Sequence, residues 1–330
     1  MPTQRMPGGM APMLATAGPL PREESAFAFE IKWDGVRALV HAIDAQLHVE
    51  SRRLADITPR YPELWPLAGL VGRSVVLDGE VVAFDEQGRP SFGHLQHRMH
   101  VTDPRDVRRR MDRYPVAFMA FDVLWLDDRS TIGLPYRERR AVLESLGLDH
   151  PCWSTPRHHL GDGAGLLAAV RAQGMEGIVA KRLDSVYEPG RRSRAWIKVK
   201  SKPRQEVVVG GWIAGSGNRS GLLGALVTGY YQSGELLYAG RVGTGFTEKT
   251  LHDLGRLLAP LERDTSPFAT KLAPNDASLR HVRFVEPRLV AEVEFSEWTA
   301  AGTMRHPSFK GLRSDKVPEE VVREPLGAGD

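Results

Sequence analysis

The stretch Phe27-Ala28-Phe29-Glu30-Ile31, followed directly by Lys32-Trp33-Asp34-Gly35-Val36-Arg37, decides the fold of the first part of this chain. Apolar side chains alternate along its first five residues, which predicts a half-buried strand. The glycine in the next six residues predicts a turn in which the backbone passes close to a ligand. Lys32 is therefore expected at the end of a strand, beside a turn, where its amine can meet a bound molecule.

Alternating strand and helix patterns continue from this stretch to about Lys200. Apolar runs predict strands at residues 37–43, 47–50, 74–84, 116–125, 177–181 and 195–200. Gly79 interrupts the third of these runs, which indicates two strands that meet near a ligand. Helical spacing that ends at a glycine predicts helices at residues 136–146 and 165–172.

The pattern changes after Lys200. Residues 201–204 form a short polar joint with a proline, which predicts a hinge. Short strands are then expected at residues 206–213, 222–231, 236–242 and 289–295. One helix is expected after Thr247, with an inner face made of Leu251, Leu254, Leu257 and Leu258. About five strands and one helix are typical of a small β-barrel of the oligonucleotide-binding (OB) type.

The predicted fold class is therefore α+β with two domains. The first spans residues 1–201, with an extended N-terminal arm over residues 1–20, and the second spans residues 202–330. A length of 330 residues favours two domains over one.

Composition narrows the class of protein. A hydrophobic content of 42% and a charged content of 26% are ordinary for a soluble globular protein. The single Cys152 excludes an intrachain disulfide and a cysteine-rich metal site, which fits a reducing cytoplasm. No apolar run is long enough to span a bilayer, and the eleven histidines lack the spacing of metal ligands. We expect a cytoplasmic protein with no membrane partner.

The net charge of +3 does not by itself predict a nucleic-acid partner, but positive charge is gathered in three clusters. These basic clusters span residues 98–113, 181–204 and 305–316. Such clusters are often only solvated surface. Several of them around one candidate site favour a track for a phosphate backbone.

Lys32 is a candidate nucleophile. A lysine amine attacks phosphorus only when it is unprotonated, whereas an ordinary lysine has a pKa of about 10.4. Burial and neighbouring cations disfavour the ammonium form, so we expect them to lower the pKa of Lys32. Lys198 and Lys200 alternate along one predicted strand, point to one face, and can supply that positive field while neutralising phosphate oxygens. The alternative is that they only protect an edge strand from aggregation.

Four further residues are candidates beside this lysine. Glu80 and Glu176 each follow or precede a glycine in apolar sequence, where carboxylates can bind ribose hydroxyls or one Mg²⁺ ion. The alternative for either is an exposed turn. Phe121 is either a core residue or a platform on which a base stacks. Arg52, next to a second arginine, suits bidentate contact with phosphate.

Taken together, these segments resemble the ATP-dependent DNA ligases of the covalent nucleotidyltransferase superfamily, of the bacterial ligase C and ligase D type. The resemblance extends from about Met13 to about Val322, and its motifs occur in the family's order. They are Lys32-Trp33-Asp34-Gly35-Val36-Arg37, Ser51-Arg52-Arg53, Leu77-Asp78-Gly79-Glu80, Phe121-Asp122, Glu176-Gly177-Ile178-Val179-Ala180-Lys181, Trp196-Ile197-Lys198-Val199-Lys200 and Arg313-Ser314-Asp315-Lys316. The resemblance implies an ATP-grasp-like nucleotidyltransferase domain, followed by an OB domain that opens and closes over the active site.

The resemblance also implies a role for each site residue. Lys32 would carry a covalent AMP, with Asp34, Lys198 and Lys200 in the other catalytic positions. Glu30 would contact the adenine edge, Phe121 would stack on the base, and Glu80 would bind ribose. Glu176, together with Glu80, would hold Mg²⁺ or Mn²⁺. Arg37 and Arg52 would contact AMP or the 5′-phosphate at a nick, and the first step would be assisted from the second domain by Arg313, Asp315 and Lys316.

The family reaction implied by the resemblance has three transfers. Lys32 attacks the α-phosphate of ATP, AMP passes to the 5′-phosphate of a nick, and the 3′-hydroxyl displaces AMP. Nicked or broken duplex DNA would be the substrate, in DNA repair or end joining. By family analogy a Ku-type end-binding protein and a repair polymerase would be partners of a monomer associated with the bacterial nucleoid. Because the chain begins with Met1 and shows no polymerase or nuclease domain, we expect a stand-alone ligase C type, and the alternative is a domain cut out of a larger protein.

Two other kinds of function remain open at this point. An RNA ligase or an mRNA-capping guanylyltransferase uses the same lysine chemistry. A nucleic-acid-binding protein without catalysis would need only the basic clusters. The joint presence of Lys32, both glutamates and both paired lysines favours an enzyme over the inert protein.

Overall fold

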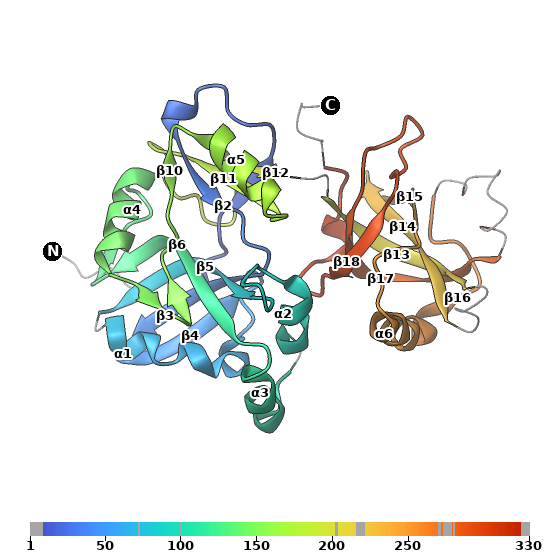
Figure 1. Cartoon of the computed structure of the whole chain (residues 1–330), viewed down its shortest axis with the longest axis horizontal. Coiled ribbons are helices and arrows are strands. Elements are labelled where there is room, and N and C mark those ends of the chain that lie inside the picture. Colours follow the sequence, from blue (N-terminus) through green and yellow to red (C-terminus); the bar gives the residue numbers. More distant parts are fainter. Residues whose placement is uncertain are drawn as a thin grey trace. The chain divides into compact units, whose positions relative to one another are not determined.

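The computed structural model describes residues 9–71, 73–99, 101–201, 204–215, 222–269, 272, 279 and 281–324 (Figure 1). The chain divides into two compact units, Met1–Ser201 with Leu326–Asp330, and Lys202–Pro325. Residues 1–8 of the predicted arm and residues 202 and 203 of the predicted hinge lie outside the described residues. Within the described part of the chain, no helix is both long and apolar enough to cross a membrane.

The first sheet of the first unit has the strand order β1-β12-β11-β2-β10. Its strands are β1 (Leu14–Ala17), β2 (Phe27–Ile31), β10 (His159–Leu160), β11 (Gly177–Arg182) and β12 (Arg192–Lys200). β1 pairs parallel with β12, so a segment that was predicted to be an extended arm is in fact an edge strand. Helix α5 (Gly163–Ala172) covers the apolar face of this sheet, where Phe29, Ile178 and Val199 pack.

The second sheet has the order β4-β3-β5-β6-β9-β8, with β7 paired to β6. Its strands are β3 (Val36–Ile43), β4 (Gln46–Ser51), β5 (Val75–Ala83), β6 (Val116–Leu126), β7 (Arg129–Ser130), β8 (Asp149–His150) and β9 (Trp153–Ser154). The prediction of two strands separated at Gly79 is wrong, because β5 runs through this residue. A Cβ at Gly79 would lie 2.4 Å from the ring of Phe118. The glycine therefore serves the close packing of an aromatic ring and not a chain break.

Residues of α1 (Leu67–Val71), α2 (Phe92–Met99) and α4 (Tyr136–Ser145) pack in one buried cluster with the second sheet, whose other face meets the first sheet. The first unit also contains α3 (Pro104–Met111) and the short 3₁₀ turns η1 (Glu24–Ala26), η2 (Thr58–Arg60) and η3 (Pro62–Leu64). Leu39, Val76 and Trp125 of the second sheet share a buried cluster with Trp196 of β12. The two sheets consequently pack face to face, and the side chains between them define the interior in which the predicted site residues are found.

The second unit is a β-sheet of the order β15-β14-β13-β17, with β16 and β18 paired to β17. Its elements are β13 (Arg204–Ala214), β14 (Leu223–Gln232), β15 (Glu235–Val242), α6 (Glu248–Leu258), η5 (Ala259–Leu261), β16 (Glu262–Arg263), β17 (Arg283–Glu294), β18 (Ser308–Leu312) and η7 (Pro318–Glu320). A parallel bridge between Thr244 and Ser308 joins the end of β15 to β18 and closes the sheet. This closed five-strand order, with a helix between the third and fourth long strands, is that of an OB barrel.

Helix α6 confirms three of its four predicted inner leucines. Thr247 caps its N-terminus, and Leu251, Leu254 and Leu258 are buried. Leu257, however, is 45% exposed. It lies beside the i, i+3, i+7 stripe and not on it, because successive residues are rotated by about 100° around the helix axis.

The buried ion pair between α4 and β6 gives a stability prediction. Arg139 donates to both carboxylate oxygens of Asp122 at 2.8 and 2.9 Å, and also to the carbonyls of Leu134 and Ser185. Arg139→Met leaves a buried carboxylate uncompensated, so we expect a loss of about 3–5 kcal/mol in the free energy of unfolding, measured by urea denaturation. Arg137→Met, at an exposed position of the same helix, is the control. Equal stability of the two variants would contradict the assignment.

Candidate functional site

The register of the first sheet places the predicted residues on one face. Glu30 of β2 lies opposite Val179 of β11, which in turn lies opposite Lys198 of β12. Lys200 lies opposite Gly177, whose carbonyl accepts from the backbone of Lys32 at 2.9 Å. Directly opposed residues of antiparallel strands share a face. This polar face is the reverse of the apolar face that α5 covers.

Lys32 and Glu176 are in direct contact. The Lys32 amine lies 2.5 Å from a carboxylate oxygen of Glu176, and their side chains are 23% and 5% exposed. Asp34 and Glu80 are also close enough for their charges to act on this amine. The structure thus brings together four of the predicted site residues, from three separate motifs, around one nitrogen atom.

The charge balance around Lys32 differs from our expectation. Burial lowers the pKa of Lys32, but the Coulomb attraction and hydrogen bond of Glu176, together with the charges of Asp34 and Glu80, outweigh it. The pKa of Lys32 is therefore raised above its ordinary value, and the expectation of a lowered pKa is wrong. The arrangement favours the ammonium form of Lys32.

Gly35 explains how the turn after Lys32 comes so close to Glu80. A Cβ at Gly35 would lie 2.2 Å from the carbonyl oxygen of Val81 and 2.9 Å from Cγ of Glu80. No other residue type fits against β5 at this distance. The glycine predicted to allow a close approach does so, and it brings the turn against a strand that carries one of the carboxylates.

Glu30 is buried in a network that the sequence did not reveal. Its carboxylate accepts a hydrogen bond from the Tyr136 hydroxyl, pairs with Lys181 at 2.8 Å and lies 3.6 Å from a guanidinium nitrogen of Arg140. Burial lowers the pKa of Lys181, and its amine also donates to the carbonyl of Phe121 at 2.9 Å. Glu30 is thus held in place from three sides by α4 and β11.

Phe121 lies among cations. The Arg37 guanidinium is 4.6 Å and the Lys181 amine 4.4 Å from the centre of the Phe121 ring. Arg37 also donates to both oxygens of the buried Asp78, at 2.5 and 2.6 Å, and the Tyr187 hydroxyl donates to Asp78 at 2.6 Å. The predicted phosphate ligand Arg37 is therefore tied to a carboxylate in this structure. Arg52 lies, half-buried, in the turn after β4.

The predicted residues of the second unit pair with one another. Arg313 donates to both oxygens of Asp315 at 2.9 Å and to Glu292 at 3.3 Å. Lys316 lies 2.7 Å from Glu206. Attraction to these carboxylates raises the pKa of Arg313 well above its ordinary value, against the effect of burial. These residues all belong to the second unit.

The three basic clusters are not three equivalent surfaces. In cluster 98–113, Arg98 is fully buried and pairs with Glu63. In cluster 181–204, Lys181 is buried against Glu30, and Arg182 pairs with Asp184. In cluster 305–316, the pairs are Arg305 with Glu297, Lys310 with Glu294, Arg313 with Asp315 and Lys316 with Glu206. Many of the charges in these clusters are therefore paired with carboxylates, and the expectation that several clusters form a track for a phosphate backbone stays a prediction.

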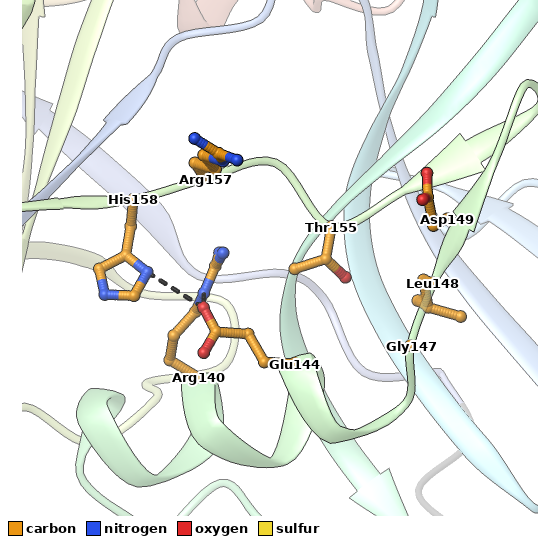
Figure 2. Close-up of a pocket in the computed structure, with 8 residues that line it drawn as sticks. All are labelled: Arg140, Glu144, Gly147, Leu148, Asp149, Thr155, Arg157 and His158. Carbon is orange, nitrogen blue, oxygen red and sulfur yellow. Dashed lines mark hydrogen bonds and ion pairs between the residues drawn. The ribbon is translucent and has the colours of Figure 1, made fainter.

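A pocket of about 310 Å³ lies beside the Glu30 network (Figure 2). Arg140 links the two, because it contacts Glu30 on one side and Glu144 on the other, at 2.8 Å. His158 lies 3.3 Å from the same Glu144. None of the predicted site residues lines this pocket, whose lining consists of Arg140, Glu144, Gly147, Leu148, Asp149, Thr155, Arg157 and His158.

The residues that the sequence analysis missed are those that support the site. Tyr136 and Arg140 lie in a run of arginines and glutamates that is typical of a solvated helix, and only the tertiary structure buries them. Lys181 was grouped with a basic cluster. The one available signal was its place in the apolar strand 177–181, since a lysine inside such a run needs a buried partner.

The carboxylates around Lys32 fit a divalent cation. Among the residues that the structure describes, no group of three or more His, Cys, Asp or Glu side chains is arranged to enclose a metal. Mg²⁺ needs only one or two protein carboxylates, since phosphates and waters complete its shell. Glu176, Asp34 and Glu80 all act on the Lys32 amine, so carboxylate oxygens, which Mg²⁺ prefers as ligands, gather at this point.

The raised pKa of Lys32 gives a prediction. Glu176→Gln removes the largest effect that opposes burial, so we expect the pKa of Lys32 to fall below its wild-type value. The pH dependence of Lys32 modification by an amine reagent, read by peptide mass spectrometry, measures this. Glu138→Gln, on exposed surface, is the control. In the wild type, the stability contributed by the Lys32–Glu176 pair is present below the ordinary lysine pKa and is lost as the pH rises through the folded value. An unchanged or higher pKa in the variant would refute the charge balance.

Comparison with known sequences identifies related proteins. The family model "ATP dependent DNA ligase domain" matches residues 12–200, and "ATP dependent DNA ligase C terminal region" matches residues 219–316. The multifunctional non-homologous end joining protein LigD of Mycolicibacterium smegmatis is 47% identical over 320 residues, which are 96% of this chain and 40% of the relative. A DNA ligase of Thermococcus onnurineus is 31% identical over 310 residues, 89% of this chain and 52% of the relative. The chain thus spans about half or less of the length of these relatives.

Comparison with solved structures supports the fold. A structure described as mycobacterial DNA ligase D complexed with ATP and MES is 44% identical, has a TM-score of 0.70, and covers 96% of this chain and 98% of its own. The likeness confirms the predicted α+β class, with a nucleotidyltransferase domain followed by an OB domain. Because the first family model covers more than half of the sequence, the assignment does not depend on any single motif. The chain belongs to the ATP-dependent DNA ligase family.

Proposed function

We propose that this chain seals nicks in duplex DNA, with ATP as the source of a covalent lysyl-AMP intermediate on Lys32. The observation that carries the proposal is the contact of 2.5 Å between Lys32 and Glu176, with Asp34 and Glu80 acting on the same amine. Membership of the ATP-dependent DNA ligase family favours DNA sealing over RNA ligation, capping or inert binding.

The first transfer requires a free amine at Lys32. Glu176, 2.5 Å from this amine, stabilises the ammonium, and the proton is proposed to pass to solvent once Glu176 is engaged elsewhere. The neutral nitrogen then attacks the α-phosphorus of ATP, a phosphorus–nitrogen bond forms, and the bond to pyrophosphate breaks. Lys198 and Lys200 share the polar face with Lys32 and are proposed to neutralise the phosphate oxygens as negative charge moves.

Glu176 and Glu80 are the residues proposed to hold Mg²⁺ or Mn²⁺. A divalent cation held there would offset the carboxylates that stabilise the Lys32 ammonium and would polarise the phosphate. With the carboxylates offset, the effect of burial would lower the pKa of Lys32. Asp34 remains beside the amine and positions it.

The adenine is proposed to lie between Phe121 and Val179. Both pack against the cluster between the two sheets, and Val179 lies between Glu30 and Lys198 on the polar face. Glu30, fixed by Tyr136 and Lys181, is suited to accept a hydrogen bond from the base edge, and Glu80 is suited to bind ribose before or beside the metal.

Two further groups of residues are proposed to contact the substrates, one in each domain. Arg52 is proposed to bind AMP or the 5′-phosphate at the nick. Arg37, held by Asp78, acts first through its contact with Phe121, and a direct phosphate contact requires a change in its pairing. In the OB domain, Arg313, Asp315 and Lys316 are proposed to assist the first transfer, in which pyrophosphate leaves.

The place of this reaction in the cell is also a proposal. The relatives from mycobacteria carry the name of multifunctional non-homologous end joining proteins, and the structural relative was solved with ATP. On that basis we propose that this chain uses ATP and acts on broken DNA, together with a Ku-type end-binding protein and a repair polymerase.

The proposal is tested by measuring the steps that need AMP on Lys32 separately from the final sealing step. Lys32→Ala removes the nitrogen that carries AMP, so it is expected to abolish sealing of a 5′-phosphate nick with ATP. The same variant is expected to seal a nick that already carries AMP on its 5′-phosphate, because the last transfer uses only the 3′-hydroxyl. Gel analysis of labelled nicked duplex measures both.

The controls separate the competing functions. Lys249→Ala, on exposed surface of α6, is expected to behave as the wild type. Nicked RNA and GTP, tested in parallel, represent RNA ligation and capping. Sealing of a 5′-phosphate nick by Lys32→Ala, or a preference of the wild type for nicked RNA, would overturn the proposal.

A further inference from the structure

The basic cluster at residues 98–113 contains several exposed arginines. In helix α3 and the turn that follows it, four arginine side chains lie on the surface: Arg105, Arg108, Arg109 and Arg113. Arg109 pairs with Asp106 at 2.7 Å. Among the described residues, Arg105 and Arg108 have no ion-pair partner. By contrast, on helix α6 both Lys249 and Arg256 lie within 4 Å of Asp253.

The spacing of these arginines makes a stripe. Residues four apart on a helix are neighbours on one side of it, and each step advances about 6 Å along the axis. Arg105 and Arg109 follow this spacing and Arg108 lies beside them, while Arg113 lies in the turn just after the end of α3. Guanidinium groups at such intervals suit a row of phosphates, because each one presents several donors in a plane.

Buried contacts fix this helix to the body of the first unit. Arg98, at the end of α2, is fully buried and donates to both oxygens of Glu63 and to the carbonyls of Arg60 and Tyr114. Arg110 of α3 donates to the carbonyl of His97, whose ring stacks on Tyr114 at 4.3 Å. A buried ion pair is a poor source of net stability. Here it fixes the position of the α2–α3 segment.

Helix α3 stands at the margin of the first unit, away from β2, β11 and β12 (Figure 1). We propose that its exposed arginines bind the phosphate backbone of duplex DNA at a distance from the nick. This inference rests on the proposed DNA ligase function and adds a second contact with the same substrate. In this proposal α3 increases the affinity for duplex DNA, and the transfer of AMP takes place at the Lys32 site.

The test compares two triple variants that remove the same charge. Arg105→Gln/Arg108→Gln/Arg113→Gln changes α3, and Arg129→Gln/Arg137→Gln/Arg171→Gln changes exposed arginines elsewhere on the first unit. The affinity for a nicked duplex that lacks its 3′-hydroxyl is measured over a series of salt concentrations. Each phosphate contact contributes about 0.9 to the slope of log affinity against log salt. We expect the α3 variant to lower that slope by roughly 2 to 3 and the control variant to leave it unchanged.

AMP attachment from ATP in the absence of DNA is measured on the same samples. Both variants are expected to match the wild type, which shows that they are folded and separates this inference from the proposed function. Equal slopes for the α3 variant and the wild type would overturn the inference, as would equal losses in both variants. If the wild type itself attaches no AMP and binds no nick, the proposed function fails instead.

Discussion

The contact between the Lys32 amine and the Glu176 carboxylate joins two segments that are 144 residues apart in the sequence. It forms because β2 and β11 are neighbours in one sheet, and each carries one of the two residues at its end. The contact stores Lys32 as an ammonium with a raised pKa. In the proposed reaction the nitrogen becomes a nucleophile only when these carboxylates are otherwise engaged, and the same residues are proposed to hold the cation.

The rest of the first unit serves this geometry. Sheet register sets Glu30, Val179 and Lys198 side by side, and the apolar reverse face packs against α5, so a shift of one residue would turn the site into the core. The second sheet supplies Glu80 and Phe121 from the other side. Buried groups such as Asp78 with Arg37, and Asp122 with Arg139, hold these strands at fixed positions.

The sequence predicted most of the long strands and the helices α4, α5 and α6, because local patterns specify them, but it did not predict β1, α2 or α3. Period-two runs gave the strands, and the leucine spacing gave α6 apart from Leu257. Its failures have a common cause. Arg98 and Arg139 resemble solvent-exposed arginines in the sequence. Their buried partners, Glu63 and Asp122, are distant in the sequence, so no local pattern predicts these ion pairs. The raised pKa of Lys32 was missed for the same reason, because it depends mainly on Glu176, a carboxylate far away in the sequence, with smaller contributions from Asp34 and the distant Glu80.

The central claim is that the nitrogen of Lys32, and no other, becomes bonded to AMP. Incubation of the protein with ATP and Mg²⁺, followed by proteolysis and mass spectrometry of the peptides, locates the added AMP. The account predicts one AMP per chain, on the peptide that contains Lys32, through an acid-labile phosphoramide. AMP on Lys198, Lys200 or Lys181, or no AMP on any peptide, would contradict it.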